Sequence, residues 1–179
     1  MASDYLISKW KLWYTWFDIN NDGKVDFEDA EAERSKFSKL HHLSDEEKKS
    51  VMEEFGNWWK EYILWGQAEM TEPKFVELMN DAYKADKAKF LERMQTCFDK
   101  ICNIVDTNND GDISLEEFNI IMRSAGHKDK SLDEKFFENY KPVDGKVPIK
   151  VISDSWVQFT TCEDSTKHDL VKAAFEFGV

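Results

Sequence analysis

Two twelve-residue segments of the chain repeat one arrangement of acidic and amide side chains around a glycine. They read Asp18-Ile-Asn-Asn-Asp-Gly-Lys-Val-Asp-Phe-Glu-Asp29 and Asp106-Thr-Asn-Asn-Asp-Gly-Asp-Ile-Ser-Leu-Glu-Glu117. Together these segments carry nine of the twelve net negative charges of the 179-residue chain. Like charges packed this densely repel one another unless a cation or solvent faces them. Any fold of this chain must therefore present two compact acidic loops.

Both segments match D-x-[DN]-x-[DN]-G-x5-[DE], the calcium-binding loop of the EF-hand helix–loop–helix. Ca²⁺ prefers six to eight oxygen ligands at about 2.3–2.6 Å, and a tight loop directs alternate residues inward to supply them. In the first loop the predicted ligands are Asp18, Asn20, Asp22, the Lys24 carbonyl, Asp26 and Asp29. In the second loop they are Asp106, Asn108, Asp110, the Asp112 carbonyl and Glu117, with Ser114 acting through a water. An Asx-rich solvated turn is the alternative for a single match, but two complete matches favour ion binding.

Apolar residues on both sides of the loops repeat at helical spacing. The entering helix of an EF-hand faces the core one, four, five and eight residues before its loop. In the first hand these positions hold Phe17, Tyr14, Trp13 and Trp10, and in the other they hold Val105, Cys102, Ile101 and Phe98. Glycine and proline are scarce, and Ser44-x-x-Glu47 and Ser131-x-x-Glu134 match the capping box. We expect helices near 4–17, 27–39, 44–62, 72–83, 87–105, 115–125, 131–139, 149–160 and 165–176.

The same spacing reveals two further hands whose loops lack ligands. One loop starts at Ile63, has Lys74 at position twelve, and follows the inward positions Phe55, Trp58, Trp59 and Tyr62. The other is placed at Tyr140, with Gly145 and Val147 in register. The residues at loop position eight are Val25, Met70, Ile113 and Val147, which we expect to pair across short β-ribbons.

Hands fold in pairs, because one helix–loop–helix cannot bury its own apolar face. We therefore predict an all-α fold of four EF-hand units in two packed pairs, with short two-stranded β-ribbons between paired loops. Residues 1–84 form the N-terminal pair, with its first hand active and its second silent. Residues 85–179 form the C-terminal pair, with its third hand active, its fourth silent, and a C-terminal tail that packs between the lobes.

Composition excludes several classes of function. A net charge of −12 argues against nucleic acid or an anionic membrane as the main partner. The sequence has no signal-peptide pattern and no run of 18 apolar residues, so we expect a cytoplasmic protein. The three cysteines suit free thiols, and no nucleophile–base set or phosphate-binding loop points to an enzyme. We expect a monomer with no obligate protein partner.

Two active and two silent hands, an aromatic-rich core and the start Asp4-Tyr-Leu-Ile-Ser-Lys-Trp-Lys-Leu-Trp-Tyr14 give the chain a family resemblance. It resembles the invertebrate sarcoplasmic calcium-binding proteins, and among them the molluscan muscle members. The resemblance implies a Ca²⁺ and Mg²⁺ buffer in the sarcoplasm of muscle, from a family also met as seafood allergens. Many relatives keep three working loops, whereas this sequence keeps two. Asp29 replaces the usual Glu at position twelve, as in the family's first hand, and its shorter side chain favours Mg²⁺ competition at the first site.

Two alternatives to a buffer remain open. A calcium sensor opens to bind a target protein through a flexible methionine-rich groove, but this chain has six methionines and seven tryptophans. A luciferin-binding or photoprotein-like member of the same scaffold would line a cavity with aromatic side chains. The inactive fourth loop and the position of the four histidines near helix ends or in the tail disfavour that second alternative.

Overall fold

Seven of the helices begin at a side chain that accepts their first free amide groups, whereas α4 and α8 have no such cap. The computed structural model describes residues 1–179. Reciprocal capping boxes start three helices, and they join Asp26 to Asp29, Ser44 to Glu47 and Ser114 to Glu117. The capping box expected at Ser131 is wrong, because Asp129 caps that helix two residues earlier.

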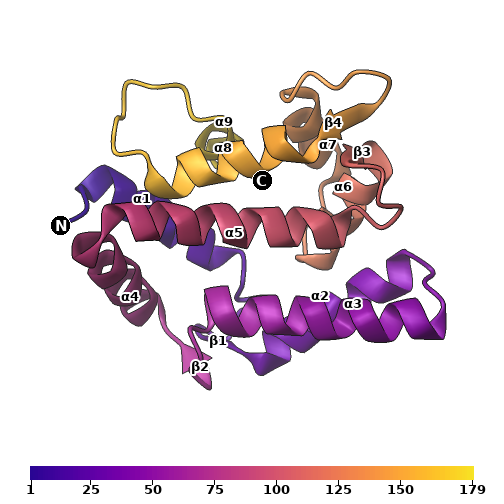
Figure 1. Cartoon of the computed structure of the whole chain (residues 1–179), viewed down its shortest axis with the longest axis horizontal. Helices are drawn as coiled ribbons and strands as arrows, with labels where there is room; N and C mark the ends of the chain where they lie inside the picture. The colour runs from indigo at the N-terminus through magenta and orange to yellow at the C-terminus, as the bar shows by residue number, and fades with distance from the viewer.

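The chain is built from helices joined by four loops, with strands only inside the loops (Figure 1). The elements of the first half are α1 (Asp4–Thr15), β1 (Val25–Asp26), α2 (Phe27–Leu40), α3 (Asp45–Trp58), the π-helix η1 (Trp59–Ile63), β2 (Glu69–Met70) and α4 (Glu72–Ala85). Those of the second half are α5 (Lys87–Val105), β3 (Asp112–Ser114), α6 (Leu115–Ser124), α7 (Lys130–Glu138), β4 (Lys146–Pro148), α8 (Ile149–Thr161) and α9 (Leu170–Glu176). None of the helices has the length and apolar composition of a membrane span.

Each active loop pairs with a silent loop through a two-stranded antiparallel ribbon. Val25 faces Met70 in the first ribbon, and Ile113 faces Val147 in the second. These four residues are the ones expected at loop position eight, and all four are buried. The predicted fold class, with four hands in two pairs, is confirmed.

The two halves share one core. Helix α5 crosses the middle of the molecule, with α8 along one side and α3 along the other (Figure 1). Helix α1 packs on α4 and α8, and α2 packs on α3 and α6, so helices of both halves touch. The buried apolar side chains form one continuous cluster. The division into residues 1–84 and 85–179 stays a prediction.

The start of the last helix and the start of the fourth loop differ from the sequence-based expectation. The last helix starts at Leu170 instead of residue 165, because Asp169 accepts the Lys172 amide as its N-cap. The fourth loop starts one residue later than expected, at Lys141. Phe136, Phe137 and Tyr140 are the buried residues before it, and they fill the inward positions only in that frame. Val147 still faces Ile113, although it is the seventh residue counted from Lys141 and not the eighth. This loop is therefore one residue shorter than the other three before its ribbon.

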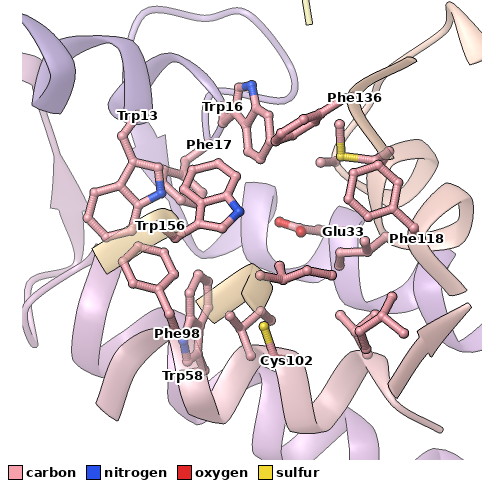
Figure 2. A pocket seen from close by; sticks show the side chains of 17 residues that line it. Trp13, Trp16, Phe17, Glu33, Trp58, Phe98, Cys102, Phe118, Phe136 and Trp156 are labelled. Atoms are coloured by element: carbon pink, nitrogen blue, oxygen red, sulfur yellow. The ribbon is translucent and has the colours of Figure 1, made fainter. Parts of the chain in front are cut away.

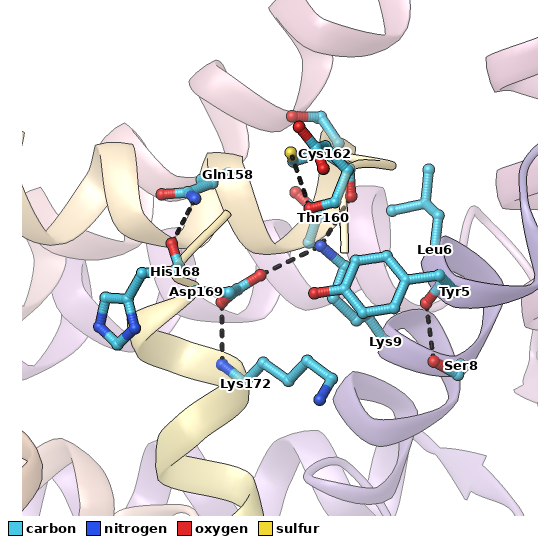
Figure 3. A network of polar contacts seen from close by, with 12 residues as sticks. Tyr5, Leu6, Ser8, Lys9, Gln158, Thr160, Cys162, His168, Asp169 and Lys172 are labelled. Carbon is cyan, nitrogen blue, oxygen red and sulfur yellow. Dashed lines mark hydrogen bonds and ion pairs between the residues drawn. The ribbon is translucent and has the colours of Figure 1, made fainter. Parts of the chain in front are cut away.

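A buried ion pair holds the first helix to the C-terminal segment (Figure 3). The Lys9 ammonium is fully buried and donates to Asp169 Oδ2 at 3.1 Å and to the Cys162 carbonyl at 2.8 Å. It also lies 4.7 Å from the centre of the Tyr5 ring. Next to it, Trp10 Nε1 donates to the Thr160 carbonyl at 2.9 Å. The polar groups of α1 are thus satisfied by residues about 150 positions later in the chain.

One carboxyl group lies inside the apolar core. Glu33 of α2 is 5% exposed, and its Oε2 atom has no hydrogen-bond partner. Burial raises the pKa of Glu33 to about 8, the nearby Trp59 indole lowers it in part, and the charge of Asp29 raises it further. The sequence analysis missed this residue. Its spacing could have revealed it, because Glu33 follows Asp29 and Ala30 and precedes Phe37 on the buried face of α2.

Replacing Asp169 with Asn tests the buried ion pair. Asparagine keeps the N-cap of α9 but leaves Lys9 charged, buried and unpaired, which costs roughly 3–5 kcal/mol. We expect that loss in the free energy of unfolding of the ion-loaded protein, measured in urea. The control is Asp154→Asn, which breaks the exposed pair with Lys150 and should change stability little. Equal effects of the two substitutions would contradict a special role for Lys9.

Glu33 makes stability depend on pH. Its folded-state pKa of about 8 exceeds its ordinary value of 4.5, so between these values the folded protein holds one more proton than the unfolded chain. Stability from this group is complete below pH 4.5 and decreases as pH rises, by about 1.4 kcal/mol per unit. We expect Glu33→Gln to flatten the curve of unfolding free energy between pH 5.5 and 8, whereas exposed Glu53→Gln keeps the wild-type slope. A wild-type slope in Glu33→Gln would refute this assignment.

Candidate metal centres

The first acidic loop is organised by hydrogen bonds from its own backbone. Asp18 accepts the amides of Asp22 and Gly23 at 3.1 and 3.0 Å. Asn20 accepts the Asp22 amide at 3.1 Å, and Asp22 accepts the Lys24 amide at 3.1 Å. Gly23 has a φ of +90°, in the left-handed region that favours glycine. These bonds bring the side-chain oxygens of positions one, three and five to the inside of one turn.

The second acidic loop repeats this scheme position by position. Asp106 accepts the amides of Asp110 and Gly111 at 3.2 and 2.9 Å. Asn108 accepts the Asp110 amide at 3.2 Å, and Asp110 accepts the Asp112 amide at 3.0 Å. Two stretches of chain that are 88 positions apart therefore adopt the same local structure.

The carboxylate at position twelve closes each loop. Asp29 accepts the amides of Ile19 and Asn20 at 2.9 and 3.2 Å with one oxygen, and the Asp26 amide at 3.0 Å with the other. In the second loop Glu117 accepts the amide of Thr107 at 3.1 Å and the amide of Ser114 at 2.9 Å. Each of these two carboxylates thus connects the start of its loop to the N-terminus of the following helix.

Three of the predicted ligands are buried and form no ion pair with a basic side chain: Asp29, Asp106 and Glu117 are 1%, 4% and 6% exposed. Burial raises the pKa of Asp29, although the amides of Asp26, Asn20 and Ile19 oppose that rise. A buried carboxylate is costly unless a positive charge compensates it. The donor chemistry of both loops therefore suits a hard divalent cation.

In each acidic loop, a lysine side chain contacts one of the predicted ligands. Lys24 Nζ lies 3.3 Å from Asp26 Oδ2 and 3.3 Å from Glu69 Oε2. Lys146, from the silent fourth loop, forms an ion pair with Asp110 and lowers the pKa of that carboxyl group. The sequence analysis assigned only the backbone carbonyl of Lys24 and gave Lys146 no role. The role of Lys146 could have been inferred from the register of the second ribbon, because that register places Lys146 opposite Ser114.

No group of three or more Asp, Glu, His or Cys side chains converges as a closed metal cluster. The predicted donor sets contain four carboxylates in the first loop and three in the second, so in this structure these side chains are not yet gathered at the distances of an ion site. All eleven predicted residues lie in the two active loops. Asp112 is at the ribbon, and Asp26 accepts the Glu28 amide at 2.9 Å.

The silent loops keep the framework without the ligands. Ile63, at position one of the second loop, is fully buried and ends the π-helix η1. Tyr140, which precedes the fourth loop, is 7% exposed and its hydroxyl hydrogen-bonds Ser155 Oγ at 2.7 Å. Where an active hand directs oxygens inward, both silent hands place apolar or aromatic groups in the core.

Comparison with solved structures supports the fold. The calcium-loaded apo form of coelenterazine-binding protein from Renilla muelleri matches with a TM-score of 0.76 and 19% identity, over 94% of this chain and 93% of that one. The photoprotein mitrocomin from Mitrocoma cellularia matches with a TM-score of 0.69 and 19% identity, over 97% and 93% of the two chains. At this identity the likeness establishes the arrangement of the helices alone.

Sequence relatives are more specific. No protein-family model matches the chain. A sarcoplasmic calcium-binding protein of Hediste diversicolor is 25% identical over 126 residues, which are 69% of this chain and 71% of the relative. The sarcoplasmic calcium-binding protein of the scallop Mizuhopecten yessoensis is 41% identical over 176 residues, 97% of this chain and 99% of the relative. The chain therefore belongs to the sarcoplasmic calcium-binding proteins, which bind calcium and are not enzymes.

Proposed function

We propose that the protein is a cytosolic buffer of Ca²⁺ and Mg²⁺ in the sarcoplasm of muscle, with one ion in loop 18–29 and one in loop 106–117. The observation that carries this proposal is the shared hydrogen-bond scheme of the two loops, in which buried carboxylates without a basic partner accept the same backbone amides. The remaining two loops have no oxygen set and bind no ion. The protein's task is then to take up and release cations as their concentration changes.

In the first site Asp18, Asn20, Asp22, Asp26, Asp29 and the Lys24 carbonyl hold the ion. In the second, Asp106, Asn108, Asp110, Glu117 and the Asp112 carbonyl do so, with Ser114 acting through a water. The bound ion supplies the positive charge that these carboxylates lack. Lys24 and Lys146 compete with it for Asp26 and Asp110, and each must release its carboxylate when the ion enters.

The distribution of apolar surface favours a buffer over a sensor. Six large hydrophobic residues are exposed, and they are spread over different elements: Met1, Phe27, Leu91, Val143, Val151 and Phe177. The large aromatic side chains pack against one another in the interior, as Trp13 does against Phe17, Phe75 and Phe98. A target protein needs a contiguous apolar patch, so we propose a monomer without an obligate partner. A luciferin-binding role has only the fold likeness in its favour.

Asp29 is the basis for assigning Mg²⁺ to the first site. Its side chain is one methylene shorter than that of Glu117, and its two oxygens already accept three backbone amides. A shorter side chain reaches an ion less easily with both oxygens, which favours six ligands over seven. Mg²⁺ demands six and Ca²⁺ accepts seven or eight, so this loop tolerates the smaller ion better.

Removing the position-one ligands tests the number and place of the sites. We expect calorimetric titration of the wild type to give two Ca²⁺ per chain, and Asp18→Ala and Asp106→Ala each to give one, because each loses the first oxygen of one loop. Exposed Asp45→Ala should keep two. Binding of an apolar-surface dye should not increase with Ca²⁺. Strong Ca²⁺-dependent dye binding would contradict the buffer proposal and favour a calcium sensor.

Exchanging the position-twelve residues tests the Mg²⁺ assignment. Asp29→Glu should raise the preference of the first site for Ca²⁺ over Mg²⁺ by roughly tenfold, or about 1.4 kcal/mol. The reciprocal Glu117→Asp should make the second site more tolerant of Mg²⁺. Competition titrations of both variants measure these shifts. Unchanged Mg²⁺ affinity in Asp29→Glu would contradict the assignment of Mg²⁺ to the first site.

A further inference from the structure

An apolar cavity of about 100 Å³ lies in the core of the molecule, and its wall includes Ile113 of the second acidic loop (Figure 2). Sixteen of its seventeen lining residues are hydrophobic, and they come from both halves of the chain. Aromatic side chains form much of the wall: Trp13, Trp58, Phe98, Phe118 and Trp156. The seventeenth residue is Glu33.

The carboxyl group of Glu33 points into this cavity, between the aromatic side chains and Cys102 (Figure 2). Glu33 is 95% buried and forms no ion pair, and its Oε2 atom accepts no hydrogen bond. A buried polar group without a partner is costly, and native proteins rarely keep one without a reason. The core therefore contains a mainly apolar space with an unsatisfied carboxyl oxygen at its wall, and the indole N–H groups of Trp16 in the wall and of Trp59 near Glu33 also have no hydrogen-bond partner.

Water does not suit this space. A water needs two to four polar partners, and this wall offers few polar groups, so waters in the cavity would be poorly satisfied. An engineered apolar cavity of about 150 Å³ stays dry and binds benzene. A molecule with a flat apolar body and one hydrogen-bond donor would fill the cavity and also give Glu33 a partner. Aromatic walls favour an aromatic body, because ring edges pack well against ring faces.

We propose that this cavity is a binding site for a small neutral aromatic molecule of one ring that carries one hydroxyl or N–H group, with Glu33 as its hydrogen-bond partner. The volume limits the ligand to about the size of phenol. The wall includes Ile113 of the second acidic loop but none of the predicted ion ligands, so binding of the aromatic molecule is measured independently of the Ca²⁺ stoichiometry.

Phenol and toluene are the probes, because they have nearly the same shape and only phenol has a hydroxyl donor. Each is titrated into the full-length, calcium-loaded protein and followed by calorimetry. We expect one phenol per chain, and at least about tenfold weaker binding of toluene, because toluene leaves Glu33 unpaired. This comparison needs no variant and therefore does not depend on how any substitution folds. Absence of saturable phenol binding at millimolar concentration, or equal binding of the two probes, overturns the proposal.

Variants then locate the site. Glu33→Leu should weaken phenol binding at least about tenfold and leave toluene binding unchanged or tighter. Ala125→Leu, which fills part of the cavity, should abolish binding of both probes. Glu53→Gln, on the exposed face of α3, should change neither affinity. Circular dichroism and the Ca²⁺ stoichiometry confirm that each variant is folded. Wild-type phenol affinity in both Glu33→Leu and Ala125→Leu would place the ligand elsewhere and overturn the proposal.

Discussion

Asp29 and Glu117 each hold three parts of the structure together with one carboxylate. Each group accepts amides from the start of its loop and from the residue that caps the next helix. The geometry of the loop, the direction of the exiting helix and the position of the ribbon therefore depend on the same few hydrogen bonds. An ion that binds such a carboxylate acts directly on the helix that follows it. In this protein those helices are α2 and α6, and they pack against each other.

The contact between α2 and α6 connects the two acidic loops, because each loop leads directly into one of these helices. His41, at the end of α2, lies with Nδ1 3.4 Å from the hydroxyl of Thr107, at position two of the second loop. The amide of that same Thr107 is bound by Glu117. The aromatic core continues across this junction without a break. Residues that flank both acidic loops therefore belong to one shared core.

Much of this arrangement could be predicted from local sequence patterns, because spacing alone determines which residues enter a loop or face a core. The loop glycines, the position-eight pairs and the inward aromatic residues of the first two hands all follow from such spacing. Contacts between distant segments carry no such local signal. Lys9, for example, resembles any lysine of an amphipathic helix until Asp169 is placed beside it. The one-residue shortening of the fourth loop was also hidden, because its ribbon side keeps the usual register.

The ion pair between Lys9 and Asp169 has a consequence for the order in which the protein is made. Helix α1 leaves the ribosome well before the partners of Lys9 and of the Trp10 indole, which lie about 150 positions later at residues 160–169. Until those residues emerge, α1 carries a charge and an indole N–H that cannot be buried satisfactorily. The first hand is thus fully synthesised long before all of its stabilising contacts can form. Nascent chains must keep this aromatic helix exposed or protected until residues 160–169 have emerged.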